Sequence, residues 1–205
     1  MSALQQARFL SSAAAAKDFP PASVPELAFA GRSNVGKSSA LNALAGRRRL
    51  AFASKTPGRT QMINFFALGG RGRLADLPGY GYASAPHALR STWDELIGSY
   101  LLERKPLVGV VVLMDARRPL TDNDRNFLEW LRPGAALRLI LLSKADKLAR
   151  AEQAKTLART RVALDRAALT SRVILFSSKS GEGVAETRAL LEAWLRDKKP
   201  PEKGN

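Results

Sequence analysis

The sequence predicts an α/β fold in which a mostly parallel, six-stranded sheet lies between two layers of helices. Short apolar runs alternate with helical patterns along the 205 residues, as expected of strands joined by crossover helices. The runs at residues 107–115 and 137–143 are almost continuously apolar, which is typical of strands buried on both faces. A glycine-rich segment at residues 31–38 separates a predicted strand from a predicted helix.

The remaining elements continue this alternation to the end of the chain. Further strands are expected at residues 26–30, 62–68, 73–76 and 173–177. Helices are expected at residues 37–44, 121–131, 150–167 and 184–196, and near residues 87–103. In the last helix the apolar side chains fall on one side, which makes Trp194 a core residue. The pattern contains no internal repeat.

The chain length suits one domain with short extensions. We expect an N-terminal extension at residues 1–22, the domain itself at residues 23–197 and a disordered basic tail at residues 198–205. The first 17 residues contain Arg8 and Lys17 but no acid, so a transit peptide is one interpretation. A short strand or arm is preferred, because the segment has no clear apolar region or cleavage site.

Composition excludes several classes of protein. The absence of cysteine excludes disulfide bonds and cysteine-based metal sites, and the single histidine, His87, cannot form a metal cluster. The longest apolar run, residues 107–114, is far shorter than the ~20 residues that cross a bilayer. We therefore expect no membrane insertion and a cytoplasmic location. The net charge of +15 favours a polyanionic partner, and its clustering favours nucleic acid.

The glycine-rich segment fits the pattern G-x-x-x-x-G-K-[ST], which makes the expected fold that of a three-layer P-loop NTPase. Its glycines let backbone N–H groups approach phosphates, and the helix N-terminus adds positive potential. Lys37 is expected to contact the β- and γ-phosphates, and the Ser38 hydroxyl to ligate Mg²⁺. The predicted phosphate loop consists of Gly31, Arg32, Ser33, Asn34, Val35, Gly36, Lys37 and Ser38.

A second motif has the form D-x-x-G and ends the predicted strand at residues 73–76. Its aspartate, Asp76, can hold Mg²⁺ through water, and its glycine, Gly79, lets the backbone approach the γ-phosphate. The polar loop before this strand contains Thr56 and Thr60, either of which can complete the magnesium shell and respond to the γ-phosphate. The motif consists of Asp76, Leu77, Pro78 and Gly79.

A third motif follows the strand at residues 137–143 and predicts recognition of guanine. The carboxylate of Asp146 can accept hydrogen bonds from guanine N1–H and the exocyclic amino group, a donor pair that adenine lacks. The stem of Lys144 can pack on the base. Ser143 departs from the commoner Asn/Thr-Lys-x-Asp pattern but keeps a hydroxyl, and Ser177 can support the Asp146 region from the last strand. The motif consists of Ser143, Lys144, Ala145 and Asp146.

These elements, in this order, resemble the translation-factor class of GTPases and, more finely, one bacterial family. The stretches that carry the resemblance are residues 31–39, 56–61 (Thr56-Pro57-Gly58-Arg59-Thr60-Gln61), 76–83 (Asp76-Leu77-Pro78-Gly79-Tyr80-Gly81-Tyr82-Ala83) and 115–120 (Asp115-Ala116-Arg117-Arg118-Pro119-Leu120). They are similar to the EngB family, also called YihA or YsxC, of ribosome-biogenesis GTP-binding proteins among the TrmE-Era-EngA-EngB-Septin-like GTPases. The similarity covers almost all of residues 8–197.

The resemblance implies a Ras-like G domain that hydrolyses GTP to GDP and acts in assembly of the large ribosomal subunit, with a need in cell division and septation. It implies the large subunit or its rRNA as partner, and it selects Thr60 over Thr56 as the magnesium ligand. The expected catalytic groups are Lys37, Thr60 and Gly79. The nucleotide site is completed by Gly58, Arg59, Gln61, Met62, Phe176, Ser177 and Ser178. Nothing in the sequence demands a dimer, so a monomer is expected.

Two residues lead to predictions about the rate of hydrolysis and the ions that it requires. Tyr80 directly follows the D-x-x-G motif, where a glutamine could orient the attacking water, so we expect slow intrinsic turnover. Asn34 stands at a phosphate-loop position that helps to bind K⁺ in several related GTPases. Potassium is therefore a second expected cofactor beside Mg²⁺, with simple bracing of the loop by Asn34 as the alternative.

Positive charge is concentrated in two regions. One is the loop before residue 62, with Arg47, Arg48, Arg49, Lys55 and Arg59 and no acid among residues 45–75. The other is a helix face with Lys155, Arg159 and Arg166. Together they favour a phosphate-rich surface such as rRNA, and binding through the first would depend on nucleotide state. Two alternatives stay open: a P-loop phosphotransferase acting on a small molecule, and an RNA-binding protein with a regulatory nucleotide site.

Overall fold

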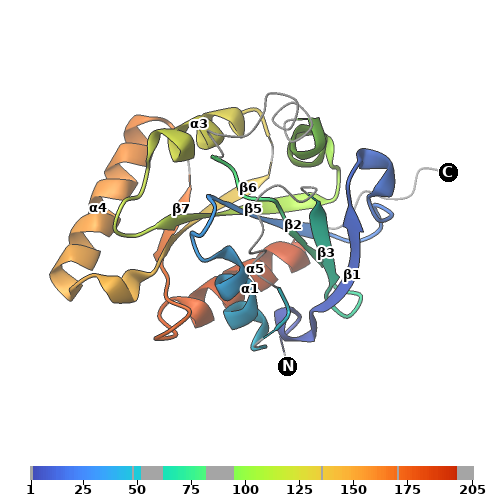
Figure 1. Ribbon diagram of the computed structural model, residues 1–205, viewed down its shortest axis with the longest axis horizontal. Helices are drawn as coiled ribbons and strands as arrows, with labels where there is room; N and C mark the ends of the chain where they lie inside the picture. Colours follow the sequence, from blue (N-terminus) through green and yellow to red (C-terminus); the bar gives the residue numbers. More distant parts are fainter. Residues whose placement is uncertain are drawn as a thin grey trace.

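The computed structural model describes residues 2–47, 49–51, 62–81, 95–134, 136–169 and 171–197. Within these residues the chain forms a seven-stranded sheet in the order β1-β3-β4-β2-β5-β6-β7 (Figure 1). The strands β4, β2, β5, β6 and β7 run parallel, whereas β3 is antiparallel to both of its neighbours. The strands are β1 (Arg8–Ala13), β2 (Glu26–Gly31), β3 (Ile63–Ala67), β4 (Arg73–Asp76), β5 (Leu107–Asp115), β6 (Leu137–Ser143) and β7 (Arg172–Leu175).

The N-terminal segment forms a short strand, as preferred from the sequence. Because this strand, β1, adds to one edge of the sheet, the predicted number of six strands is wrong. β1 pairs with β3, and Ser12 Oγ donates a 2.6 Å hydrogen bond to Asn64 Oδ1 across the pair. Only Ala13 of the strand is buried, and Phe9 is 62% exposed. An edge strand that covers so little core lacks the apolar alternation from which strands are predicted.

Helices cover both faces of the sheet, as the predicted three layers require. Helices α1 (Lys37–Ala45) and α5 (Val184–Asp197) lie on one side, and α3 (Asp122–Trp130) lies on the other (Figure 1). The π-helical turn η3 (Ser99–Glu103), which continues a helical turn at residues 95–98, and α4 (Arg150–Arg166) pack on the same face as α3. Short 3-10 turns are η1 (Leu4–Gln6), η2 (Ala16–Asp18) and η4 (Ala145–Lys147).

Two apolar clusters fill the space between the sheet and its helices. Leu41 and Leu44 of α1 and Leu191 of α5 contribute to one cluster, while Phe127 of α3 and Tyr100 of η3 contribute to the other. The predicted core role of Trp194 agrees with its packing against the first cluster. Apolar side chains therefore cover both faces of the sheet. The strand ends and the outer surfaces of the helices remain for polar functions.

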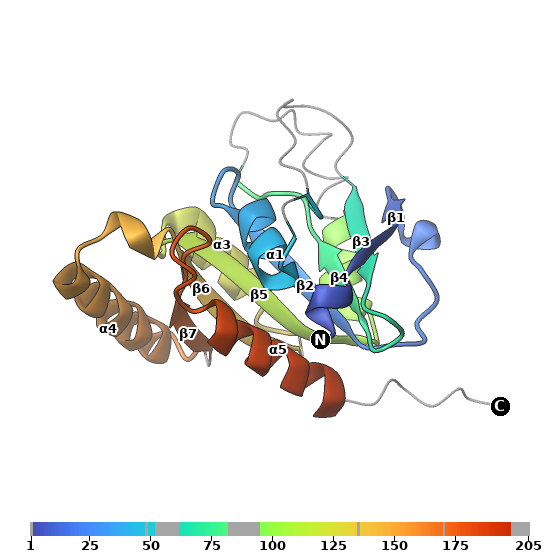
Figure 2. The same cartoon turned by 90° about the horizontal axis from the view of Figure 1, so that it is seen from below.

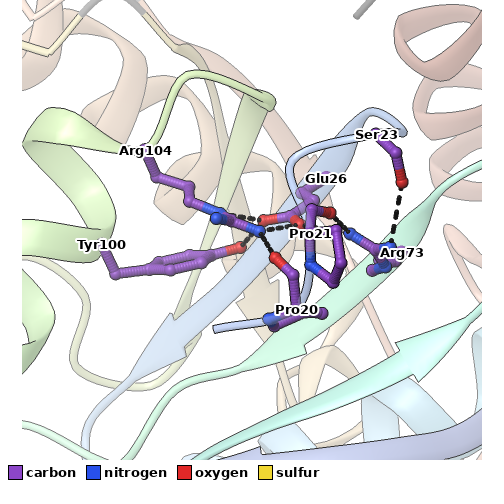
Figure 3. Close-up of polar contacts among 7 residues, drawn as sticks. All are labelled: Pro20, Pro21, Ser23, Glu26, Arg73, Tyr100 and Arg104. Atoms are coloured by element: carbon purple, nitrogen blue, oxygen red, sulfur yellow. Dashed lines mark hydrogen bonds and ion pairs between the residues drawn. The ribbon is translucent and has the colours of Figure 1, made fainter. Parts of the chain in front are cut away.

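The amino ends of the central strands are held together by a buried carboxylate. Glu26, at the start of β2, is fully buried and accepts hydrogen bonds from Tyr100 Oη at 3.0 Å and from Arg73 Nη1 at 3.1 Å (Figure 3). The Arg104 guanidinium donates to both oxygens, at 2.7 and 3.0 Å. Glu26 thereby joins β4 and the end of η3 to β2 at the amino ends of the strands. The predicted nucleotide site lies at the opposite, carboxyl ends.

Candidate functional site

The carboxyl ends of the parallel strands bring the predicted motifs to one edge of the sheet. Residues 31–38 follow β2 and lead into α1, residues 77–80 follow β4, residues 143–146 end β6, and residues 176–178 follow β7. In Figure 2, α1 and the loop before it lie next to β2 and above α5. Segments that are up to 147 residues apart in sequence, such as Gly31 and Ser178, therefore share one edge.

The phosphate loop has the backbone conformation that its glycines and asparagine permit. Gly36 has φ +102° and Asn34 has φ +60°, both in the left-handed region. A Cβ on Gly31 would lie 2.7 Å from Val35 Cγ1, so a side chain at the end of β2 would displace the phosphate loop or its neighbours. Lys37 begins α1 directly after this turn. The first N–H groups of α1 therefore open onto the loop, an arrangement that attracts phosphate.

The D-x-x-G motif packs against this loop. Asp76, at the end of β4, is 6% exposed and forms an ion pair with Lys37 Nζ. Tyr80 N–H donates to Gly31 O at 3.3 Å, and a Cβ on Gly79 would lie 3.2 Å from Ser33 N. The absence of a side chain at Gly79 therefore allows the two backbones to approach. Leu77 is buried, while Pro78 and Ser38 are half-buried.

Asp146 and Ser177 form the polar end of the predicted base site. Ser177 is fully buried, and its hydroxyl donates a 2.7 Å hydrogen bond to Asp146 Oδ1. This hydrogen bond is the main cause that lowers the pKa of the Asp146 carboxyl below its ordinary value. Ala145 N–H donates to Phe176 O at 3.1 Å, which joins the two loops. Asp146 is thus an ionised acceptor held by the segment after β7.

The strand β7 ends earlier than predicted, at Leu175 rather than at Ser177. The Ser177 hydroxyl oxygen also accepts hydrogen bonds from the backbone N–H groups of Lys179 and Ser180, at 3.2 and 3.1 Å. These local bonds turn the chain away from the sheet. Phe176 is buried and Ser178 is exposed.

Lys144 crosses from the base site to the phosphate loop. Its backbone is left-handed, with φ +59°, and its Nζ donates to Asn34 O at 2.9 Å. The same ammonium pairs with Asp115 Oδ2 at 3.1 Å, and Arg117 also pairs with that carboxylate. These cations, Arg117 first, hold the pKa of Asp115 well below its usual range. Asp115 therefore positions Lys144, a role that the sequence motif did not reveal.

Ser143 belongs to the motif that was expected to recognise the base, but its side chain lies against the phosphate loop. It is 3% exposed, and its hydroxyl donates to Val35 O at 2.7 Å. The hydroxyl oxygen also lies 3.1 Å from Met114 O. The hydroxyl thus braces the phosphate loop against the ends of β5 and β6. The pattern of the third motif alone gave no signal for this contact, because Val35 is 108 residues earlier in the chain.

The Tyr80 side chain packs into the core on the α3 side. It is 6% exposed, its ring stacks on Phe127 at a centroid distance of 4.4 Å, and its hydroxyl donates to Asp124 Oδ1 at 2.9 Å. Burial, together with the Asp124 charge, raises the pKa of the phenol far above its ordinary value. Tyr80 is therefore a neutral hydrogen-bond donor at all ordinary pH values.

Part of the predicted site lies outside the described residues. Gly58, Arg59, Thr60 and Gln61 fall there, as do Thr56, Arg48, Lys55 and His87. Met62, just before β3, is described and is 40% exposed. The structure therefore brings together the phosphate loop, the D-x-x-G motif and the two base-site segments.

This arrangement defines the class of the protein as a P-loop GTPase: a phosphate loop follows β2, a D-x-x-G turn follows β4 and an Asp-bearing base loop follows β6 of a mostly parallel sheet. A family model described as "50S ribosome-binding GTPase" matches residues 26–144. The chain belongs to the EngB family of GTP-binding proteins within that group.

Close relatives match along nearly the whole chain. A probable GTP-binding protein EngB from Dechloromonas aromatica (strain RCB) is 51% identical over 214 residues, covering 100% of this chain and 97% of the relative. A probable GTP-binding protein EngB from Thiobacillus denitrificans (strain ATCC 25259 / T1) is 52% identical over 193 residues, covering 94% of this chain and 92% of that protein. These identities show the family.

Solved structures show the same fold at low sequence identity. The crystal structure of a probable GTP-binding protein engB has a TM-score of 0.63 at 23% identity, over 84% of this chain and 100% of that one. The crystal structure of Era in complex with MgGDPNP and nucleotides 1506–1542 of 16S ribosomal RNA has a TM-score of 0.66 at 18% identity, over 88% of this chain and 60% of that one. Among the described residues, no helix has the length and apolar character needed to cross a bilayer.

Proposed function

We propose that this protein is a cytoplasmic guanine-nucleotide switch that binds GTP with Mg²⁺, hydrolyses it slowly and acts in assembly of the large ribosomal subunit, with a need in cell division and septation. The observation that carries the proposal is the convergence of Lys37, Asp76 and Asp146 on one edge of the sheet. Full-length similarity to proteins described as GTP-binding EngB supports it. Residues 23–197 would form the G domain, to whose sheet the N-terminal segment adds β1.

The phosphate end of the site would bind the nucleotide through backbone and cation. The left-handed turn at Asn34 and Gly36 and the first N–H groups of α1 suit the β-phosphate. Lys37 would contact the β- and γ-phosphates, and the Gly79 N–H would reach the γ-phosphate. Asp146, ionised and held by Ser177, would accept two hydrogen bonds from guanine.

The residues present fit a magnesium ion. Asp76 and Ser38 offer a carboxylate and a hydroxyl at the same strand-end edge, and oxygen donors are the ligands that Mg²⁺ prefers. The ion pair between Asp76 and Lys37 places the carboxylate within reach of the phosphate loop. Ser38 and Thr60 would hold the ion directly and Asp76 through water. Mg²⁺ supplies charge neutralisation at the β- and γ-phosphate oxygens.

The environment of Tyr80 supports slow hydrolysis without a partner. Its ring and hydroxyl are committed to Phe127 and Asp124, so it does not stand in for a water-orienting glutamine. Turnover by the purified protein should therefore be far below ~1 s⁻¹, the lower end of typical enzyme turnover. A partner, or K⁺ near Asn34, would complete the site.

A groove between α3 and α4 is the described surface best suited to rRNA. It has a volume of about 620 Å³ and is lined by Arg125 of α3, by Arg159 and Arg166 of α4, and by small apolar residues that include Val162. None of the three guanidinium groups forms an ion pair with a carboxylate in the described part of the chain. Unpaired guanidiniums around an apolar floor suit phosphate and ribose.

The basic residues that line the groove differ from the predicted basic helix face in one respect. Lys155 pairs with Glu152 at 3.3 Å and does not line the groove, whereas Arg125, from another helix, does. The α4 residues Arg159 and Arg166 remain in the proposed surface.

Binding to large ribosomal subunits tests the assembly role. We expect co-sedimentation with 50S subunits in a GTP analogue and less in GDP. The combined change Arg125→Ala, Arg159→Ala and Arg166→Ala should weaken binding by about tenfold or more and reduce its salt dependence.

A matched control removes the same charge from cations that are already paired. Arg132, Lys155 and Arg172 each pair with an acid, so their combined replacement by alanine should change affinity by less than about threefold. Equal losses in the two triple variants would contradict the groove as the contact. Identical co-sedimentation in GTP analogue and GDP would contradict a nucleotide-controlled switch.

A further inference from the structure

The carboxylate of Asp124 accepts hydrogen bonds from three separate segments of the chain. Asp124 is fully buried near the start of α3. Its Oδ2 accepts from Thr121 N–H at 3.0 Å and from Thr121 Oγ1 at 2.8 Å, and its Oδ1 accepts from Arg32 Nε at 3.0 Å and from Tyr80 Oη at 2.9 Å. A buried carboxylate is stable only when its charge and lone pairs are satisfied, so each of the three partners contributes to its stability.

Capping of α3 accounts for only one of the two oxygens. Thr121 and Asp124 form a capping box, in which the aspartate at the third helical position bonds the backbone N–H of the residue before the helix. The Oδ2 atom alone makes that contact. Oδ1 is turned toward residues outside the helix, so Asp124 does more than begin α3.

The two partners of Oδ1 come from the phosphate loop and from the segment directly after the D-x-x-G motif. Arg32 is the second residue of the phosphate loop, and Tyr80 directly follows the D-x-x-G motif. Their backbones form a short parallel bridge, and the Tyr80 N–H donates to Gly31 O at 3.3 Å. Arg32 also donates to Arg118 O at 3.2 Å, after β5. A displacement of the D-x-x-G turn would therefore alter the distance from Tyr80 to the Asp124 carboxylate.

Tyr80 contacts α3 at a second point. Its ring stacks on Phe127, three residues after Asp124, with an interplanar angle of 14° and a centroid distance of 4.4 Å. Residues three apart on a helix share one face, so Asp124 and Phe127 hold the phenol from the same side. The turn after β4 and helix α3 are thus joined by a hydrogen bond and by a stacked ring pair.

We propose that Asp124 is a positioning residue that couples helix α3 to the nucleotide site through Tyr80 and Arg32. The inference rests on the proposed function, since it requires that GTP and GDP bind at this edge. Loss of a γ-phosphate contact at Gly79 would move Tyr80, and α3 would respond because a buried carboxylate cannot be left without its partners. Arg125, the next residue of α3, lines the proposed RNA groove, so the response would reach that surface.

Hydrogen exchange of the α3 amides tests this coupling directly. Binding of GDP and of a non-hydrolysable GTP analogue is first measured by calorimetry for the wild-type protein. Exchange of residues 122–131 is then compared between the two nucleotide states in four proteins: wild type, Asp124→Asn, Tyr80→Phe and Glu129→Gln. Tyr80→Phe keeps the stacked ring but removes the hydroxyl, and Glu129→Gln neutralises an exposed carboxylate on the same helix.

We expect the wild-type protein and Glu129→Gln to show a difference in α3 exchange between the two nucleotides. Asp124→Asn and Tyr80→Phe should lose more than about half of that difference, because coupling needs both ends of the contact. If Asp124→Asn fails to fold, Tyr80→Phe carries the test. Equal differences in all folded proteins, or no difference in a wild type that binds both nucleotides, would overturn the coupling alone. A wild type that binds neither would overturn the proposed function itself.

Discussion

The Ser143 hydroxyl donates a 2.7 Å hydrogen bond to the carbonyl oxygen of Val35, and so ties the base loop to the phosphate loop. Both groups are buried, with Ser143 and Val35 each 3% exposed. Because a buried carbonyl without a partner costs free energy, this hydrogen bond holds the phosphate loop in place. The serine that departs from the commoner guanine motif thus acts on the phosphate end of the site.

Replacing Ser143 by alanine should weaken nucleotide binding without changing base preference. We expect the free energy of unfolding to fall by about 1–2 kcal/mol, since the Val35 carbonyl loses its partner. Affinity for GDP should fall while the ratio of GDP to ADP affinity stays constant. Calorimetry and urea denaturation measure the two effects, with Ser11→Ala on the edge strand β1 as the control. A selective loss of guanine preference would assign the hydroxyl to the base instead.

Replacing Ser177 by alanine should raise the pKa of Asp146. The Ser177 hydroxyl is the main cause that lowers this pKa, so its removal returns the carboxyl toward its ordinary value. NMR titration of the Asp146 carboxyl carbon measures the shift. Guanine affinity should fall as well, because the carboxylate loses the group that orients it. An unchanged titration curve would show that the hydrogen bond does not form in solution.

Glu26→Gln should destabilise the fold without altering the residues of the proposed nucleotide site. The change leaves Arg73 and Arg104, each 11% exposed in the side chain, without their shared carboxylate. Removal of one partner from such a buried group typically costs about 3–5 kcal/mol. Urea denaturation should show this loss, whereas Glu129→Gln, at an exposed pair with Arg132, should cost less than about 1 kcal/mol. Similar losses for the two variants would refute the account of this cluster.

Potassium should stimulate GTP hydrolysis through Asn34. This residue lies in the left-handed turn of the phosphate loop, and its own carbonyl is engaged by Lys144 Nζ at 2.9 Å. A monovalent cation held there would supply positive charge at the developing transition state. Turnover is compared in KCl and in NaCl for the wild type and for Asn34→Ala. Equal rates in all four conditions would leave Asn34 as a brace of the loop.

Much of the fold follows directly from the sequence. The two nearly continuous apolar runs are confirmed as β5 and β6 with the predicted bounds, because burial on both faces leaves no alternation to misread. The edge strand β1 could not be counted in the same way, since five of its six residues retain some exposure. The pattern G-x-x-x-x-G-K-[ST] placed the phosphate loop correctly between β2 and α1.

Contacts between distant segments could not be predicted from local patterns. Asp124 has the spacing of a capping residue, and nothing nearby in the sequence indicates that its second oxygen meets Arg32, 92 positions earlier. Arg125 likewise lies on a polar helix face whose sequence gives no sign of a groove, because the groove forms where α4 packs beside α3. Such pairings arise from the order of the strands, which brings remote loops to one edge.

The most direct test of guanine-nucleotide recognition is a comparison of GDP and XDP binding by the wild type and by Asp146→Asn. Xanthine carries a carbonyl where guanine carries its amino group, so a carboxylate matches guanine and an amide matches xanthine. We predict that the wild type prefers GDP by about 100-fold or more, and that Asp146→Asn loses GDP binding and gains XDP binding. Retention of full GDP affinity by Asp146→Asn would contradict the assignment of this edge as a guanine site.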